Sequence, residues 1–286
     1  ANQLGYFGTS AFGSPGIVVK FSLDATIISS CDEYSGLTGY IIVETFSSNC
    51  SRLAIRDSAL VTLIISEQNS IDEIVIENIE CSQSTYASCI DCNSTISNVQ
   101  SIRIRGVSRR NINTGATDPP LSVVRFSGSV SGNPSANDRM LTTSGISLCD
   151  STFVTHLSTA GSFNLSVVRF DGAVSHFDQI EISQLTFQNV QFDGMPSTPL
   201  IRALSFSSIL GKTSEVTIAN SSISGLPSVC TVSTCSFVEF SSSGSEDETN
   251  PEAVVEAAWS FSNNSMIQGS ELASFVKISE SSVVSA

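Results

Sequence analysis

A near-identical repeat constrains the fold of this chain more than any other feature. Leu121-Ser-Val-Val-Arg-Phe126 recurs as Leu165-Ser-Val-Val-Arg-Phe170, and Gly128-Ser-Val-Ser131 recurs as Gly172-Ala-Val-Ser175. A looser copy is Leu200-Ile-Arg-Ala-Leu-Ser-Phe206. Self-similarity at intervals of a few tens of residues is typical of proteins in which each repeat adds one unit to a stack.

A second recurring unit places apolar β-branched residues in alternation after a polar turn, as in Asp72-Glu-Ile-Val-Ile-Glu77 and Gln100-Ser-Ile-Arg-Ile-Arg105. Such alternation predicts strands with one buried face. The first apolar residues of the copies that we identify are Ile74, Ile102, Ile146, Ile180, Val216 and Val276. The long last interval predicts one more copy near Phe237 or Trp259. The apolar pattern of residues 178–192 predicts two short strands with a bend near Ser183-Gln184.

The repeats predict an all-β fold, namely a solenoid in which each repeat forms one coil, with irregular loop insertions. Ile180-Glu-Ile-Ser-Gln-Leu-Thr-Phe-Gln-Asn189 and Val216-Thr-Ile-Ala-Asn-Ser-Ser-Ile-Ser-Gly225 resemble coils of right-handed parallel β-helix proteins, the pectin-lyase-like group. This resemblance implies the fold alone and transfers no catalytic residue. Eight or so coils, about 4.8 Å apart, would form a rod about 40 Å long. The alternative is a pair of β-sandwich, Ig-like domains with strand exchange.

The expected organisation is an extended N-terminal arm followed by one repetitive domain. Residues 1–16 are rich in glycine and aromatic residues, including Tyr6 and Phe7, and fit an arm. Residues 17–286 would form the solenoid domain. A segment rich in Pro, Gly and Asn marks a possible internal boundary near 113–138.

Cysteines and glycosylation sequons predict an extracellular or cell-surface location. An even number of cysteines suits disulfides better than zinc, because the chain has a single C-x-x-C and two histidines. We expect the pairs Cys31–Cys50 and Cys230–Cys235, and Cys81 paired with Cys89 or Cys92, which leaves the other for Cys149. The Asn-x-Ser/Thr sequons, which are candidate glycosylation sites, start at Asn49, Asn93, Asn164, Asn220 and Asn263.

The charge of the chain excludes several partners. A formal net charge of −14 makes nucleic acid and anionic membranes poor partners. No apolar run approaches the ~20 residues of a membrane helix. The chain begins at Ala1, as a mature secreted protein from which a leader has been cleaved would.

Two clusters of charge are candidate sites. The arginines Arg103, Arg105, Arg109 and Arg110 could bind an acidic polysaccharide, but an outward row of ion pairs or an intersubunit contact is the preferred interpretation. Residues 242–252 contain Glu246, Asp247, Glu248 and Glu252. We interpret them as a solvated loop, with calcium binding as the alternative. We expect no cofactor other than N-linked glycans.

These features predict a structural protein and not an enzyme. The aspartates along the expected coils occur singly, whereas sugar hydrolysis needs a pair of carboxylates at a set distance. We expect a secreted glycoprotein whose copies assemble into a fibre, coat or adhesive filament, either head to tail or by exchange of the N-terminal arm. The alternative function is binding or degradation of polysaccharide.

Overall fold

Parallel strands account for the whole architecture that the computed structural model describes. The described residues are 25–68, 71–82, 87–114, 121–154, 163–193, 200–207, 210–211, 213–226, 230, 234–240, 258–268 and 274–278. They form a 20-stranded and a 4-stranded sheet, and every pairing between described strands is parallel. The expectation of an all-β fold is confirmed, and the antiparallel sandwich alternative is wrong for this part of the chain.

The large sheet consists of three rows, and strands from successive repeats lie side by side within each row. The first row contains β2 (Glu33–Ser35), the start of β4 (Cys50–Ile65), β5 (Ile71–Ser82), β8 (Ser101–Arg110), β12 (Met140–Val154), β15 (Gln179–Ser183), β19 (Glu215–Ala219) and β22 (Ala258–Ser262). The second row contains the later parts of β4, β5, β8 and β12, then β16 (Thr186–Asp193), β20 (Ser222–Leu226) and β23 (Ser265–Gln268). We use the word rung for the set of strands that the chain contributes during one turn through the rows.

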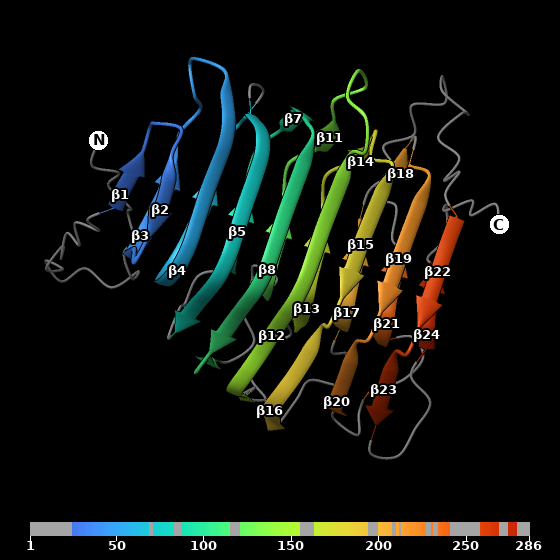
Figure 1. Cartoon of the computed structure of the whole chain (residues 1–286). Coiled ribbons are helices and arrows are strands. Elements are labelled where there is room, and N and C mark those ends of the chain that lie inside the picture. Colours follow the sequence, from blue (N-terminus) through green and yellow to red (C-terminus); the bar gives the residue numbers. More distant parts are fainter. Residues whose placement is uncertain are drawn as a thin grey trace, which may run out of the picture.

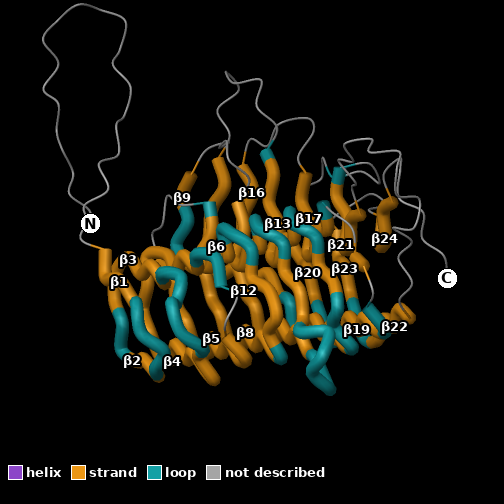
Figure 2. Tube along the Cα trace, turned by 90° about the horizontal axis from the view of Figure 1, so that it is seen from above, coloured by secondary structure: helices purple, strands orange, loops and turns teal. Residues whose placement is uncertain are grey.

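The third row lies across the curl of the sheet from the first (Figures 1 and 2). It contains β1 (Ala25–Ile28), β3 (Thr38–Val43), the end of β4, β6 (Ser88–Cys92), β10 (Leu121–Phe126), β13 (Asn164–Phe170), β17 (Leu200–Phe206), β21 (Cys235–Phe240) and β24 (Ser274–Ile278). β9 (Asn113–Thr114) pairs with the end of β12. The small sheet contains β7 (Ile96–Val99), β11 (Val130–Gly132), β14 (Val174–Ser175) and β18 (Leu210–Gly211).

The bend between the first and second rows is a column of residues in the left-handed backbone region. Their φ angles are positive in eight successive described rungs, at Gly36, Asp57, Asn78, Gly106, Gly145, Gln184, Asn220 and Asn263. Asn, Asp and Gly tolerate this region best. Gln184, with a φ of 56°, confirms the bend expected near Ser183-Gln184.

Phenylalanines stacked in register form the centre of the core. Phe126, Phe170, Phe206 and Phe240 occupy one position of the third row. Their ring centroids are 4.7, 4.9 and 5.2 Å apart, and adjacent rings are stacked with nearly parallel planes. The repeated hexapeptides therefore pair residue by residue, with Leu121 beside Leu165 and Phe126 beside Phe170.

The register corrects two of the expected repeat positions. Ile146 lies in the second row beside Val107, and the first-row partner of Ile102 is Leu141. Val276 lies in the third row beside Val238. The further copy expected near Trp259 is confirmed, because Trp259 pairs with Val216 in the first row. Alternation alone reveals a strand but not the row to which it belongs.

The repeated glycines mark a turn where successive rungs touch through their backbones. A Cβ atom on Gly172 would lie 2.2 Å from the carbonyl carbon and oxygen of Gly128, and a Cβ on Gly128 would lie equally close to Ser94. No side chain fits at either place. The repeat Gly128-Ser-Val-Ser131 and Gly172-Ala-Val-Ser175 thus reflects close packing of turns.

We predict that Phe170→Ala lowers the free energy of unfolding by about 3–5 kcal/mol, because it leaves a cavity inside the ring stack. Ser260→Ala, at an exposed position of β22, is the control and should change it by less than about 0.5 kcal/mol. Chemical denaturation measures both. Equal losses from the two variants would contradict the stacked core.

We predict that Gly172→Ala destabilises the protein by about 2–3 kcal/mol, because the backbone of Gly128 leaves no room for the methyl group. Gly211→Ala is the matched control, since its Cβ would make an ordinary 3.7 Å contact with Ser175. A Gly211→Ala variant as unstable as Gly172→Ala would contradict this explanation. Thermal unfolding compares the two.

Candidate functional site

The arginine cluster expected from the sequence is divided by the structure between the surface and the core. Arg103 and Arg110 lie on the outer side of β8 and pair with Glu73 at 3.6 Å and Glu80 at 3.9 Å. Arg105 is exposed beside Glu77, as the repeat alignment predicts. Arg109 is an exception, because its side chain is buried.

Arg109 occupies an inward position of the second row, between Cys81 and Leu148. It donates hydrogen bonds to the backbone carbonyls of Ala87 at 2.9 Å and Ser122 at 2.6 Å, which lie on two rungs of the third row. Burial lowers the pKa of this guanidinium to about 10. The expectation of an outward patch of four arginines is therefore wrong for Arg109. After the bend at Gly106, the alternation of inward and outward residues starts again. This pattern would have indicated an inward position for Arg109.

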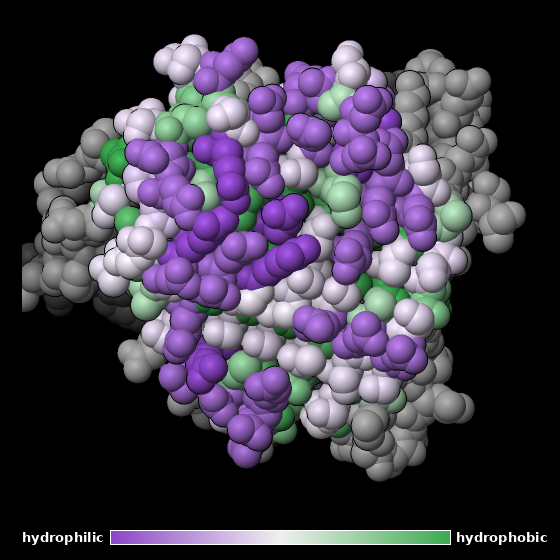
Figure 3. Space-filling model, viewed as in Figure 1, coloured by the Kyte–Doolittle hydropathy of each residue, from purple (hydrophilic) through white to green (hydrophobic). Residues whose placement is uncertain are grey.

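Acidic and basic side chains on the outer face of the first row alternate from rung to rung. Arg52 lies 3.2 Å from Glu73, which also meets Arg103, and Arg56 lies 3.1 Å from Glu77 while also contacting Glu33. This face is visibly polar over the early strands (Figure 3). Exposed pairs of this kind contribute about 0–1 kcal/mol each. They support the interpretation of an ion-pair row more than that of an anion-binding site.

A second charged cluster joins three rungs of the third row. Arg125 lies between two carboxylates, with Nε 2.8 Å from Asp171 and a terminal nitrogen 3.8 Å from Asp91. Arg169 also binds Asp171, at 2.5 Å, and the hydroxyl of Ser127 donates to Asp91. Two arginines thus balance two aspartates. The cluster therefore links the rungs, and it has no net charge that would attract a charged ligand.

Burial raises the pKa of the Asp91 carboxyl above its ordinary 3.8, against the opposing effects of the Ser127 hydrogen bond and Arg125. Asp178 shows the reverse. Hydrogen bonds from the side chain and backbone of Arg139 lower the pKa of Asp178. As the pH falls, protonation of Asp91 therefore favours the folded state, whereas protonation of Asp178 disfavours it.

The most deeply buried ion pair in the described part of the chain is one that the sequence did not reveal. Arg202 and Glu239 pair across β17 and β21, with side chains only 8% and 4% exposed. Arg202 also donates to Asn164 at 2.7 Å, and burial, then Arg169, lowers its pKa to about 10. Arg202 stands at the position that Ser166 fills in the preceding repeat. Aligning Leu200–Phe206 with the hexapeptide would have exposed this substitution.

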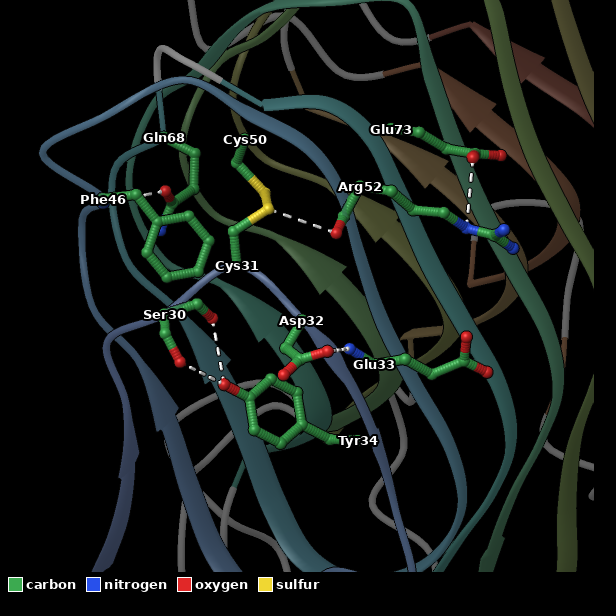
Figure 4. The surroundings of a disulfide bond; sticks show 10 residues. All are labelled: Ser30, Cys31, Asp32, Glu33, Tyr34, Phe46, Cys50, Arg52, Gln68 and Glu73. Atoms are coloured by element: carbon green, nitrogen blue, oxygen red, sulfur yellow. Dashed lines mark hydrogen bonds and ion pairs between the residues drawn. A yellow bond between two sulfur atoms is a disulfide. The ribbon is translucent and has the colours of Figure 1, made fainter.

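The disulfides confirm most of the expected pairing. Cys31–Cys50, Cys81–Cys89 and Cys230–Cys235 are bonded, which is typical of proteins that fold in an oxidising compartment. Figure 4 shows Cys31–Cys50 beside the buried Gln68, which donates to the carbonyl of Glu44 at 2.8 Å and accepts from the amide of Phe46.

The remaining pairing, Cys92 with Cys149, is wrong, because both thiols are free and buried. Cys92 lies on β6 and Cys149 on β12, which are two rungs apart and in different rows. Two strand spacings of about 4.8 Å exceed the Cα separation of about 7 Å that a disulfide tolerates.

The sequons lie in three settings. Asn49 and Asn93 are exposed beside cysteines. Asn220 and Asn263 are exposed on successive rungs of the bend, and the Asn263 amide donates to Asn220 at 3.2 Å. Asn164 is partly buried at the start of β13. Four of the five expected acceptors are therefore accessible.

The last described rung leaves core positions uncovered. The large hydrophobic residues that are exposed in the described part of the chain are Ile27 on β1, Phe261 on β22 and Val276 on β24, with 37%, 39% and 40% exposure. Phe261 continues the row of Ile182 and Ile218, and Val276 continues that of Leu204 and Val238, all of which are fully buried.

Several expected features lie outside the described residues. These are the arm at 1–16 with Tyr6 and Phe7, and the acidic segment with Glu246, Asp247, Glu248 and Glu252. Within the described ranges, no group of His, Cys, Asp and Glu could hold a metal ion. These ranges also contain no helix long and apolar enough to cross a bilayer. Comparisons with family models, curated proteins and solved structures found no match to the chain.

We predict opposite pH responses for two variants, measured as the change in unfolding free energy between pH 3 and pH 7. Wild-type Asp91, whose folded pKa is raised, costs stability as the pH rises above 3.8. Asp91→Asn should therefore gain more stability, or lose less, than the wild type over this range.

Asp178 is the matched comparison, because its lowered pKa contributes stability above 3.8 that is lost as the pH falls. Asp178→Asn should therefore gain less stability than the wild type between pH 3 and pH 7. Shifts of the same sign in the two variants would show that the assigned surroundings are wrong.

Proposed function

We propose that the protein is an extracellular structural protein whose copies stack end to end into a filament or coat. The observation that carries this proposal is the uncovered core at Phe261 and Val276 on the last described rung. Edge strands also present unpaired backbone groups that can pair with another chain. A head-to-tail contact between two different ends builds an open fibre when the copies stack along one axis and do not close into a ring.

The proposal includes the finer fold assignment, a right-handed parallel β-helix. In-register parallel rows and the resemblance to pectin-lyase-like coils support it. Connections between parallel strands of one sheet are right-handed in about 98% of cases, which supports the hand. The two ends of a β-helix differ from each other, so the end of one copy can bind the opposite end of the next.

The extracellular location is supported by the three disulfides and by the accessible sequons Asn49, Asn93, Asn220 and Asn263. Disulfides persist in secreted proteins and are rare in the cytosol. Glycans at these positions would lie on loops and on the bend. They would leave β24 and its free edge clear.

We predict that the purified chain assembles as its concentration rises, and that Val276→Lys abolishes assembly by placing a charge on the open core row. Thr217→Lys, which adds the same group to the outer side of β19, is the matched control and should assemble like the wild type. Light scattering and negative-stain microscopy measure assembly, and circular dichroism checks the folding of both variants. A wild-type chain that stays monomeric at every concentration would overturn the proposal.

A further inference from the structure

We infer that the stacked copies meet through one strand pair, β24 of one copy beside β1 of a second copy, with Val276 opposite Thr26. This inference rests on the proposed end-to-end assembly and specifies its register. The third row runs in register from Thr26 through Ile41, Leu63, Ile90, Val124, Val168, Leu204 and Val238 to Val276. The junction would continue this row by one step.

The two ends of the third row suit each other. Thr26 and Ile27 are exposed on β1, and Val276 is exposed on β24. The residues between these ends in the row of Val276 are almost completely buried against their neighbours on both sides. Adding a neighbour to each end of the third row would therefore repeat, in that row, a strand pairing that the chain already makes between its own rungs. The occupant that matches this register is a second copy of the same chain.

β22 and β2, the outermost described strands of the first row, cannot pair at the same junction. The first row has eight described strands, whereas the third row has nine, because β1 precedes β2 and has no described first-row strand in its own rung. When β24 lies beside β1, β22 is therefore two strand spacings, about 9.6 Å, from β2 of the next copy. Direct pairing of β22 with β2 would require β24 and β1 to occupy the same place.

Paired cysteines test this register. Ile27→Cys and Lys277→Cys, introduced together, occupy one register row that also contains Asp91 and Arg125. At the β24–β1 junction they would lie one strand spacing apart, so they should form disulfides between copies under mild oxidation and give a ladder of oligomers on a non-reducing gel. A bond within one chain is excluded, because the two positions lie at opposite ends of the row.

Glu33→Cys with Ser260→Cys is the matched control, since these positions share one row of β2 and β22. Their expected separation exceeds the disulfide limit of about 7 Å, so no ladder should form. If the wild type assembles but the control pair links, or neither pair links, the register is wrong while end-to-end stacking stands. If the wild type does not assemble at all, the proposed function fails first.

Discussion

In-register parallel pairing is the constraint on which the rest of this structure depends. Neighbouring strands lie about 4.8 Å apart, so each side chain contacts the side chain at the same position of the next repeat. Flat rings suit this spacing, as the stack from Phe126 to Phe240 shows. The same spacing aligns Arg125 with Asp91 and Asp171, and it brings Gly172 onto Gly128. The sequence repeats because residues at equivalent positions of successive rungs contact one another and must fit the same spacing.

Charge is used in this molecule to join rungs. The outer pairs of Arg52, Glu73 and Arg103 lie in water and contribute little, whereas Arg202 and Glu239 are almost fully buried. Removal of one partner from such a buried pair costs about 3–5 kcal/mol, because the other charge is left without compensation. The buried pair therefore favours one alignment of β17 with β21 over shifted ones. Arg109 has a similar role where it donates to two rungs.

The sequence allowed accurate prediction wherever a residue and its repeat have the same type. The pairing of Leu121 with Leu165 and the bend at Gln184 follow from visible patterns. Prediction failed where a position changes type between rungs, as at Arg109 in a row of apolar residues. It also failed for Cys92 and Cys149, since cysteine counting carries no information on which rung holds each thiol. An open end was expected from the head-to-tail assembly, but the core residues exposed there, Phe261 and Val276, were not identified, because exposure depends on which strand is last in its row.

The positions of the disulfides bear on how the molecule comes apart. Stacked repeats open most readily at their ends, where a rung has one neighbour instead of two. Cys31–Cys50 and Cys81–Cys89 lie among the first described rungs, and Cys230–Cys235 closes at the start of β21, near the last. The rungs that run from β8 to β17 contain no disulfide and rely on stacked rings and ion pairs. Reduction should therefore shorten the protected part of the rod from both ends inward, and amide exchange should advance toward β12 while the middle keeps its structure.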